Sequence, residues 1–486
     1  MRWTPAVALP VALVLVLSLA FGCGGEPSPG DGDGGGGDGG GGGDGGAIDA
    51  PDGTPACDAP ASFADGLVPT RLLHVAAGAG GGGDGSVGRP FATIQQAAAA
   101  ATPGTAIRLG PGEHTSGQYV AGLRGTATAP IWIGGEPGQP RPVLRGAGQA
   151  LHLVRPAYVV VHDLEVTGQT ANGLNVDDGG DFADDTAAHH VVLRDLHVHD
   201  VGTGGNNDCI KVSGVNDLHV LDSRIERCGA GGSGIDHVGC HRSVVARNTF
   251  AGAMSTAVQA KGGSTDVDVR QNRIAITGPR AVNLGGSTDL DLFRPPLSTS
   301  APNAEARRIR VFANVITGLG DTATPFAFVG CIDCLAAHNL VRGRQRWNVR
   351  ILQETASGGG YTFEPAANGR VLANTFVFAA ASLSTAVNVG GGTDAASFTF
   401  SHNLWYASDG GSSTPSLPVT ETGGVVGQAS GYDHLPDDPQ APITAACVGA
   451  PEAGAGVHVP EVTGTLAGAC RAAPPAAVTI GPQDGC

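Results

Sequence analysis

The chain has 486 residues, a formal net charge of −16 and 79 glycines. The negative charge excludes nucleic acid and anionic membrane surfaces as electrostatic partners. An apolar content of 41% is enough for a large core, so the chain as a whole is not disordered. Of the 28 basic residues only Lys211 and Lys261 are lysines.

Residues 1–22 have the pattern of a signal peptide. Arg2 precedes an apolar run from Val7 to Phe21, which is too short for a membrane-spanning helix. The run Leu-Ala-Phe-Gly-Cys that ends at Cys23 resembles a bacterial lipobox and predicts lipidation of Cys23. Ordinary secretion with cleavage nearby is the alternative. We expect an extracytoplasmic protein that the lipid anchor alone holds at the outer membrane or cell surface.

Residues 23–66 form a Gly- and Asp-rich tether. From residue 24 onward this segment contains nine acidic residues and no basic one. So polar a segment buries too little apolar surface to order itself. More than half of the net charge therefore belongs to the tether, and the rest of the chain is only mildly acidic.

A short helix is predicted where the tether ends and the folded body begins. Phe91-Ala92-Thr93-Ile94-Gln95-Gln96 and the alanines that follow lie between two strand-like segments. This arrangement closely resembles the N-terminal entry of right-handed parallel β-helix proteins. The resemblance implies a helix that covers the open end of a solenoid core.

Two landmarks recur from about residue 150. The first is an Asp or Asn two residues before an apolar residue, repeated from Asp163 to Asn403 at spacings of 24 to 42 residues; we interpret it as a ladder of turn residues. The second is an apolar-x-apolar triplet such as Ile210-Lys211-Val212, which has the period of a β-strand. Long amphipathic helices are missing from this region.

The repeats predict an all-β fold: a single-stranded right-handed parallel β-helix, or pectin-lyase-like solenoid, with an N-terminal capping helix. We place the solenoid at residues 67–410. Residues 411–486 form a loop-rich C-terminal tail that contains cysteines.

The middle residue of each triplet is predicted to face outward, so that these residues form one polar column. The predicted members are Asn175, Lys211, Asp236, Gln259, Asn283, Phe328, Arg350 and Asn388. Lys261 lies two residues after Gln259, beside the column. His237 shares the strand of Asp236 and turns inward unless the strand is bulged, and His241 lies just past the turn.

Both lysines of the chain fall in this patch. A lysine amine can lose its proton near neutral pH once it is desolvated or close to other cations, which suits a general base. The alternative is that each lysine forms an ion pair with a nearby carboxylate such as Asp236.

The patch resembles polysaccharide lyases of the pectate-lyase type, which abstract the proton next to a uronate carboxylate. Asp208-Cys209-Ile210-Lys211 is similar to a coil that carries the base in one such family. The resemblance implies Lys211 as the base and Asp208 and Asp236 as Ca²⁺ ligands. Separately, the acidic loop that begins at Asp177 is either a further source of Ca²⁺ ligands, with Asp177 as the candidate, or a solvated loop. Val258-Gln259-Ala260-Lys261-Gly262 resembles the coil that carries the base in alginate and chondroitin lyases, which implies Lys261 instead.

That second family places an arginine on the following coil, where this chain has Asn283. Arg294 and Arg350 are the candidates to replace it, and Arg294 lies in the longest insertion, which is predicted to wall a cleft. Together with the catalytic candidates Lys211, Lys261 and Asp236, we expect substrate contacts from Asn175, Gln259, Asn283, Arg294, Arg350, His237 and His241.

Two other functions stay open. Asn206-Asn207-Asp208-Cys209-Ile210 resembles polygalacturonase-type glycoside hydrolases, which pair carboxylates as acid and base, although Asn207 stands where that pair needs an Asp. The other open function is that of a non-catalytic surface lipoprotein, which binds glycan along the column. The first hypothesis remains a monomeric protein that acts by β-elimination on an acidic polysaccharide, with Ca²⁺ as the candidate cofactor.

The remaining histidines and cysteines are interpreted structurally. His197 and His199 share one strand face, but no partner ligand is visible in the sequence, so we favour surface histidines over a metal site. Nine cysteines remain besides Cys23, and outside the cytoplasm they can form disulfides. Because nine is odd, either one thiol is free or the lipobox assignment of Cys23 is wrong.

Overall fold

The computed structural model describes residues 57, 60–202, 204–355, 357–433, 450–474 and 476–483. The predicted signal peptide, Cys23 and most of the predicted tether lie outside these residues. The described residues form one compact unit. Within the described ranges no helix is both long and apolar enough to cross a membrane.

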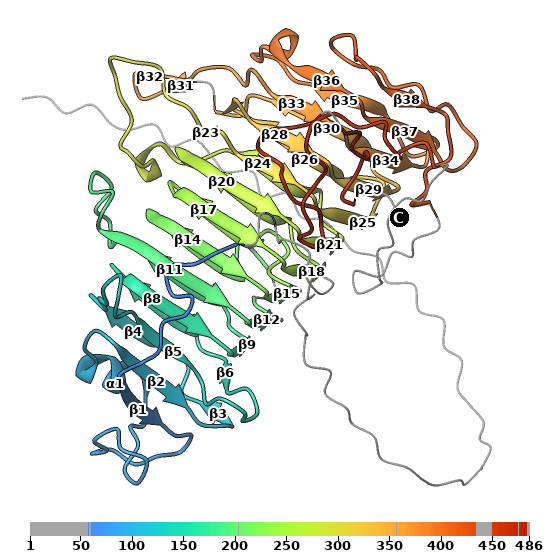
Figure 1. The fold of residues 1–486 in the computed structure, drawn as a ribbon. Coiled ribbons are helices and arrows are strands. Elements are labelled where there is room, and N and C mark those ends of the chain that lie inside the picture. The colour runs from blue at the N-terminus through green and yellow to red at the C-terminus, as the bar shows by residue number, and fades with distance from the viewer. Residues whose placement is uncertain are drawn as a thin grey trace, which may run out of the picture. The chain divides into compact units, whose positions relative to one another are not determined.

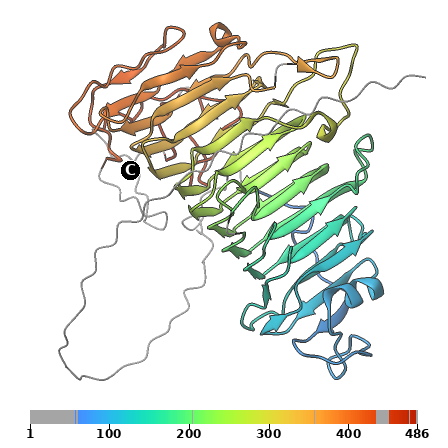
Figure 2. The same ribbon diagram turned by 180° about the vertical axis from the view of Figure 1, so that it is seen from behind.

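Three parallel sheets contain nearly all strands of the described residues (Figure 1). Each turn of the chain takes one strand from the ten-stranded sheet, one from the 14-stranded sheet and one from the 12-stranded sheet. It then returns to the first sheet beside the strand it left. The view from behind shows the same order of stacked strands (Figure 2). The predicted fold class, a right-handed parallel β-helix, is confirmed.

The strands have the following bounds. The ten-stranded sheet contains β4 (Gln118–Ala121), β7 (Leu151–Val154), β10 (Leu174–Asp177), β13 (Ile210–Ser213), β16 (Ser233–Val238), β19 (Thr256–Lys261), β22 (Arg280–Gly285), β26 (Thr324–Val329), β30 (Trp347–Leu352) and β35 (Thr385–Val389). The 14-stranded sheet contains β1 (Arg71–Val75), β2 (Thr105–Leu109), β5 (Ile131–Gly135), β8 (Ala157–His162), β11 (Ala188–Arg194), β14 (Val215–Leu221), β17 (His241–Ala246), β20 (Ser264–Arg270), β23 (Ala306–Arg307), β24 (Arg310–Phe312), β27 (Cys331–Ile332), β28 (Leu335–Ala337), β33 (Arg370–Leu372) and β36 (Thr399–Ser401). The 12-stranded sheet contains β3 (Glu113–His114), β6 (Val143–Arg145), β9 (Glu165–Thr167), β12 (His197–His199), β15 (Arg224–Glu226), β18 (Thr249–Gly252), β21 (Arg273–Ile276), β25 (Val315–Leu319), β29 (Leu340–Gly343), β34 (Thr375–Phe378), β37 (Leu404–Ala407) and β38 (Val425–Val426). The short elements outside these sheets are the antiparallel pair β31 (Ser357–Gly358) and β32 (Tyr361–Thr362), the 3₁₀ turns η1 (Leu290–Leu292) and η2 (Ala395–Ser397), and the helix α1 (Ile94–Ala100).

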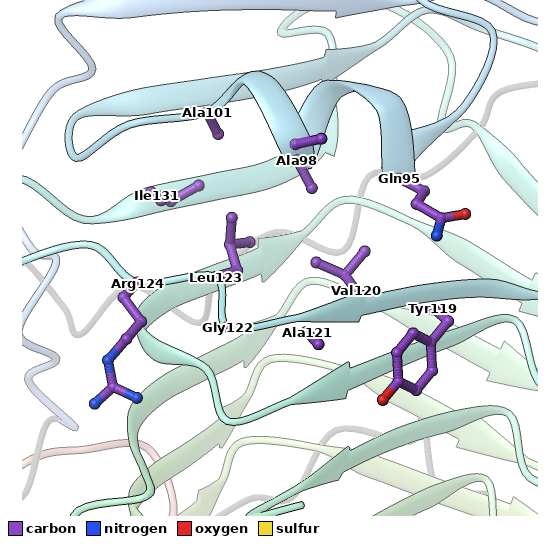
Figure 3. A pocket seen from close by; sticks show the side chains of 11 residues that line it. Gln95, Ala98, Ala101, Tyr119, Val120, Ala121, Gly122, Leu123, Arg124 and Ile131 are labelled. Atoms are coloured by element: carbon purple, nitrogen blue, oxygen red, sulfur yellow. The ribbon is translucent and has the colours of Figure 1, made fainter.

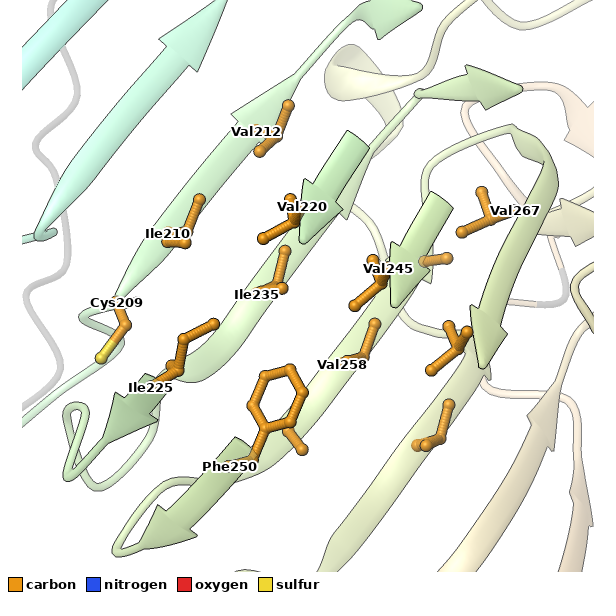
Figure 4. Close-up of a cluster of buried hydrophobic side chains, with 14 of the residues drawn as sticks. Cys209, Ile210, Val212, Val220, Ile225, Ile235, Val245, Phe250, Val258 and Val267 are labelled. Atoms are coloured by element: carbon orange, nitrogen blue, oxygen red, sulfur yellow. The ribbon is translucent and has the colours of Figure 1, made fainter. Parts of the chain in front are cut away.

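The apolar residues of the triplets fill the interior of the coils. Strand register stacks Ile210 on Ile235 and Ile235 on Val258, and all three are fully buried. Figure 4 shows these columns together with Phe250 from the 12-stranded sheet. Burying one such side chain is worth about 1.5–3 kcal/mol. Because side chains alternate along a strand, burial of these apolar residues in every coil places the residues between them on the outer face.

The helix α1 covers the first coil, as the sequence predicts. Its N-terminus is capped by Thr93, whose hydroxyl accepts the backbone N–H of Gln96 at 3.1 Å. Ile94 and Ala97 are buried and pack on the apolar core. The helix contacts β1, β2 and β4, so the core is shielded from water at this end.

A ladder of buried asparagines occupies the turn between the 14-stranded and 12-stranded sheets. Its members are Asn248, Asn272, Asn314, Asn339, Asn374 and Asn403. The Asn314 Oδ1 accepts the backbone N–H of Asn272 at 2.9 Å, and its Nδ2 donates to the carbonyl of Val269 at 2.8 Å. Backbone groups that the bend removes from the sheets are therefore paired.

The first coils use the same sequence landmark differently. The register of β15 and β18 aligns Ser223, and not Asp222, with Asn248. Asp222 and Asp195 have φ values of 51° and 53°, a left-handed conformation that Asp adopts more readily than most residues. The prediction that these aspartates belong to the ladder is wrong. Each lies at the bend, one residue before the position that is equivalent to the ladder asparagines.

The 12-stranded sheet continues beyond residue 410, the predicted end of the solenoid, because β38 pairs with β37. Glu421 ends the asparagine ladder: its Oε1 accepts the backbone N–H of Asn403 at 3.0 Å and the Asn403 Nδ2 at 2.7 Å. Farther along, Val459 and Val462 pack against Phe312 of β24. This part of the tail therefore lies against the outside of the solenoid.

Cysteines are paired across both short and long sequence separations. The described residues contain the disulfides Cys57–Cys470, Cys209–Cys228 and Cys331–Cys334, and Cys240 is a free, buried thiol. The remaining tail cysteines, Cys447 and Cys486, lie outside the described residues.

Replacing Asn314 by Ala tests the ladder. The substitution leaves the N–H of Asn272 and the carbonyl of Val269 without partners in the interior. Since an unpaired buried polar group costs about 1–3 kcal/mol, we expect the free energy of unfolding to fall by about 3 kcal/mol or more. Urea unfolding followed by circular dichroism measures this. Asn388→Ala, on the outward face, is the control, and an equal loss in both variants would contradict the ladder's role.

Candidate active site

The outward residues of the ten-stranded sheet form a column. Cα register pairs Asn175 with Lys211, Lys211 with Asp236, Asp236 with Gln259, and Gln259 with Asn283. Neighbouring strands lie about 4.8 Å apart, so these five side chains form a row about 19 Å long. The predicted column is present over this stretch.

One predicted member of the column is wrong. In β26 it is Ala327 that pairs with Asn283 and with Arg350, whereas Phe328 is fully buried in the core. Phe326 and Phe328 alternate with Ala327, so the two large rings fill the interior. Arg350 and Asn388 do lie in the column, beyond Ala327.

The two lysines share one buried carboxylate. The Lys211 ammonium forms an ion pair with Asp236, and the Lys261 Nζ lies 3.6 Å from the same oxygen, Asp236 Oδ2. Asp208 Oδ2 lies 3.6 Å from the Lys211 Nζ. The Lys211 and Lys261 side chains are 22% and 15% exposed, while Asp236 is 1% exposed. Both lysine side chains are therefore partly exposed, while the carboxylate they share is almost fully buried.

A chain of amides continues from this cluster along the column. Gln259 Nε2 donates to the second carboxylate oxygen, Asp236 Oδ1, at 3.0 Å. Asn283 Nδ2 donates to Gln259 Oε1 at 2.8 Å, and Arg280 Nη1 donates to Asn283 Oδ1 at 3.2 Å. Asp236 and Gln259 each accept from the next strand, and Asn283 accepts from Arg280 of its own strand, which fixes the orientation of both amides.

The charges in the cluster shift each other's proton affinity. Burial, together with the charge of Asp236, raises the pKa of Asp208 to about 6. Burial alone would raise the pKa of Asp236, but Lys211 and Lys261 outweigh it and hold that pKa below its usual value. Burial would lower the pKa of Lys211, but Asp236 and Asp208 outweigh it and raise that pKa.

Lys211 is therefore protonated at neutral pH. The prediction that desolvation frees the Lys211 amine as a base is wrong for this state, because two carboxylates hold its proton. The ion pair with Asp236 that we considered as the alternative is the arrangement found.

The predicted calcium ligands do not come together. Asp177 Oδ2 instead contacts His152 Nε2 at 2.5 Å and accepts from Asn175 Nδ2 at 2.8 Å. Among the described residues, Asp177, Asp208 and Asp236 do not bring their carboxylate oxygens within 4.8 Å of one another, and the Lys211 ammonium contacts both Asp208 and Asp236 in place of a metal ion. These residues do not fit Ca²⁺, and the predicted site of Asp177, Asp208 and Asp236 is wrong.

Arg294 is not available for a substrate. Its Nε and Nη2 donate to the two carboxylate oxygens of Asp178 at 2.6 and 3.0 Å, and its guanidinium lies 4.0 Å from the ring centroid of Phe182. The residue is 7% exposed. Arg294 therefore fastens the long insertion to the acidic loop after β10, and its predicted role in substrate contact is wrong.

Two histidines are also displaced from the predicted site. His237 faces the interior, as strand alternation requires, and burial lowers its pKa to about 4, so the ring is neutral. His241 begins β17 of the 14-stranded sheet, where its Nδ1 lies 2.9 Å from Thr265 Oγ1. Neither side chain lies on the column, so both predicted substrate contacts are wrong.

Aromatic residues at the two ends of the column were missed by the sequence analysis. Tyr119 pairs in register with His152, which pairs with Asn175, so both extend the column. Tyr119 is 51% exposed and borders a pocket of about 520 Å³ beside α1 (Figure 3). Toward the other end, on β30 and one strand before Asn388, the Arg350 guanidinium stacks 4.4 Å from the ring centroid of Trp347. The sequence could have shown that His152 belongs to the column, because Leu151-His152-Leu153 is another apolar-x-apolar triplet.

Comparisons with known proteins give structural likenesses only. No family model and no curated protein matches the chain. Among solved structures it is similar to pectate lyase Pel9A, at 14% identity and a TM-score of 0.49, covering 87% of this chain and 98% of that one. It is also similar to an alginate lyase from Paenibacillus sp. str. FPU-7, at 16% identity and a TM-score of 0.36, covering 67% and 97%.

A third similar structure is a mannuronic acid specific polysaccharide family 6 lyase from human gut microbiota. It shares 11% identity over 69% of this chain and 81% of that one, with a TM-score of 0.38. The strand pairing by itself defines a parallel β-helix with a polar column on one sheet. Identities this low transfer no residue's role to this chain.

The pKa of Asp208 predicts a pH effect on stability. The folded protein holds a proton on Asp208 up to about pH 6, while the unfolded chain releases it near its ordinary pKa of 3.8. The contribution of this group is therefore complete below about pH 4 and is lost as the pH rises through 6.

Asp208→Asn removes this titration and keeps an oxygen for the Ser233 N–H, which lies at 2.7 Å. We expect the thermal midpoint of the parent protein to fall more than that of the variant between about pH 4 and about pH 7. Thermal unfolding at both pH values measures the difference. The same pH dependence in both proteins would contradict the assignment.

Proposed function

We propose that this protein is a carbohydrate-active enzyme that cleaves a uronate-containing polysaccharide by β-elimination. The supporting observation is the pair of partly exposed lysines, Lys211 and Lys261, whose Nζ atoms both contact the buried carboxylate of Asp236. The column around them offers amides and, at its ends, the aromatic rings of Tyr119 and Trp347. From Asn175 to Asn283, a sugar chain laid across the strands passes one polar column residue per coil, at intervals of about 4.8 Å.

The two lysines have different roles in this proposal. Lys211, held protonated, attracts the uronate carboxylate and stabilises the negative charge that grows on it when the neighbouring proton leaves. Lys261, whose Nζ lies 3.6 Å from Asp236 Oδ2, reacts in this proposal as the neutral amine, and its lone pair accepts that proton. The carbon–hydrogen bond and the glycosidic carbon–oxygen bond break, a carbon–carbon double bond forms, and the departing oxygen takes a proton from water.

We also propose that the protein works outside the cytoplasm as a lipid-anchored monomer. The disulfides Cys57–Cys470 and Cys209–Cys228 support an oxidising compartment. The signal-peptide and lipobox patterns that end at Cys23 support the anchor.

A glycoside hydrolase is the second candidate, and one observation favours it. Asp208 and Asp236 approach the same Lys211 Nζ, with the pKa of Asp208 raised and that of Asp236 lowered. Two carboxyls whose pKa values are pushed apart are typical of acid–base pairs. Both are at most 2% exposed, however, and Lys211 covers them, so the lyase ranks first.

Incubation with pectate, alginate and chondroitin, with and without EDTA, tests the proposal. We expect the ultraviolet absorbance of unsaturated uronate to rise on one substrate and to persist in EDTA, because the carboxylates do not fit Ca²⁺. Lys261→Ala should lower kcat by about 10²-fold or more, which is typical for the loss of a general base.

The role of Lys211 needs a variant that stays folded. Lys211→Ala alone leaves buried carboxylates unpaired, so the double variant Lys211→Ala/Asp236→Asn removes charge of both signs. We expect its KM to rise and its kcat to fall. Arg344→Ala, at an exposed ion pair with Asp321, is the control and should keep full activity.

Three outcomes contradict the proposal. No absorbance change on any substrate, with glycan binding retained, supports the non-catalytic glycan-binding protein. Reducing ends without that absorbance support the hydrolase. Full activity in Lys261→Ala places the base elsewhere.

A further inference from the structure

A second cluster of chemically active side chains lies on the outward face of the 12-stranded sheet. His197 and His199 stand two residues apart in β12 on either side of the buried Val198, so both rings point outward. Glu165 of β9 pairs in register with His197. One ligand atom from each of Glu165, His197 and His199 lies within 4.8 Å of the other two. Across the described ranges of the chain, no other group of three His, Cys, Asp or Glu meets this distance.

The spacing of these atoms suits a tetrahedral metal ion. His199 Nε2 lies 3.4 Å from Glu165 Oε1. Zinc bonds of about 2.0–2.2 Å place neighbouring tetrahedral ligand atoms about 3.4 Å apart. The rings of His197 and His199 are stacked, with centroids 4.1 Å apart, so a small rotation of either ring changes the distance between their nitrogens.

A carboxylate orients one of the rings. His199 Nδ1 lies 2.6 Å from Asp200 Oδ2, which assigns the proton to Nδ1 and leaves the Nε2 lone pair facing Glu165. Hydrogen bonds of this kind, from the distal nitrogen of a histidine to a carboxylate, fix metal-ligating histidines in known sites. The side chains of His199 and Glu165 are 15% and 28% exposed, so an ion can enter from solvent.

The charges around the cluster are balanced. Glu226 Oε2 lies 3.2 Å from His197 Nε2, and Glu226 is itself paired with Arg224 at 2.7 Å and with Arg227 at 3.4 Å. Arg227 also pairs with Asp200 at 2.6 Å. Two arginines thus neutralise two outer carboxylates, and Glu165 remains as the charged ligand for a cation.

We propose that Glu165, His197 and His199 bind one divalent transition-metal ion such as zinc. Imidazole nitrogens with one carboxylate prefer zinc and its neighbours to calcium or magnesium. Three protein ligands leave one position of a tetrahedral ion for water or for a group of another molecule. The site lies on a different sheet from the lysine cluster. A test of metal binding is therefore independent of whether the protein is a lyase.

Metal binding is tested on the full chain after treatment with EDTA and desalting. We expect calorimetric titration with zinc chloride to show one equivalent bound, and Co²⁺ to give the visible absorption bands of a tetrahedral site. His197→Ala, His199→Ala and Glu165→Gln should each weaken zinc binding by more than about tenfold, since even residues that only support a ligand contribute that much.

His189→Ala is the matched control. His189 and His190 form another close pair, with their Nδ1 atoms 2.9 Å apart on the 14-stranded sheet, so loss of zinc in this variant would place the site there and overturn the proposal. Failure to bind zinc at millimolar concentration would overturn it as well. The proposal is also overturned if the double variant His197→Ala/His199→Ala still binds one equivalent of zinc. Circular dichroism and the metal-free thermal midpoint show whether each variant is folded, and His199→Gln replaces any alanine variant that is not.

Discussion

Each strand of this solenoid can pair only with the equivalent strand of the coils on either side. Every side chain therefore meets the residue at the same position one coil away, about 4.8 Å distant. Ile210, Ile235 and Val258 satisfy this constraint with apolar contact. At the bends, where sheet hydrogen bonds stop, Asn272 and Asn314 satisfy it by bonding the backbone of a neighbouring coil. Apolar residues stacked on apolar residues, and asparagines stacked on asparagines, thus hold the coils in register.

The same constraint shapes the chemistry of the outer faces. Lys211 and Lys261 stand on alternate strands, and stacking brings two cations close enough to repel each other. Asp236, on the strand between them, supplies the compensating charge, and its burial strengthens the attraction to both. The outcome is a cluster in which Lys211 is held protonated by two carboxylates, while Lys261 contacts Asp236 alone. Rigid, pre-oriented charge is what stabilisation of a developing negative charge requires.

Strand alternation and coil stacking also give two faces of the solenoid different chemistry. On the ten-stranded sheet the outward residues are amides and ammonium groups, whereas on the 12-stranded sheet His197, His199 and Glu165 gather within reach of one ion. Strand alternation places His197 and His199 on one face, and stacking supplies the carboxylate from the neighbouring coil. The third ligand is therefore visible only once the coils are aligned, because Glu165 is 32 residues from His197 in sequence.

The sequence by itself determined the solenoid and most of the column, because strand alternation is a local property that triplets such as Ile210-Lys211-Val212 display directly. It failed where the pattern is not alternating: every residue of β26 is buried, so Phe328 could not be told from Ala327. Only the tertiary structure decided the state of the charged groups. Arg294 finds its partner Asp178 at a separation of 116 residues, and the proton on Lys211 depends on carboxylates from its own coil and from the next. Long-range pairing and burial set these properties, and neither is encoded in local spacing.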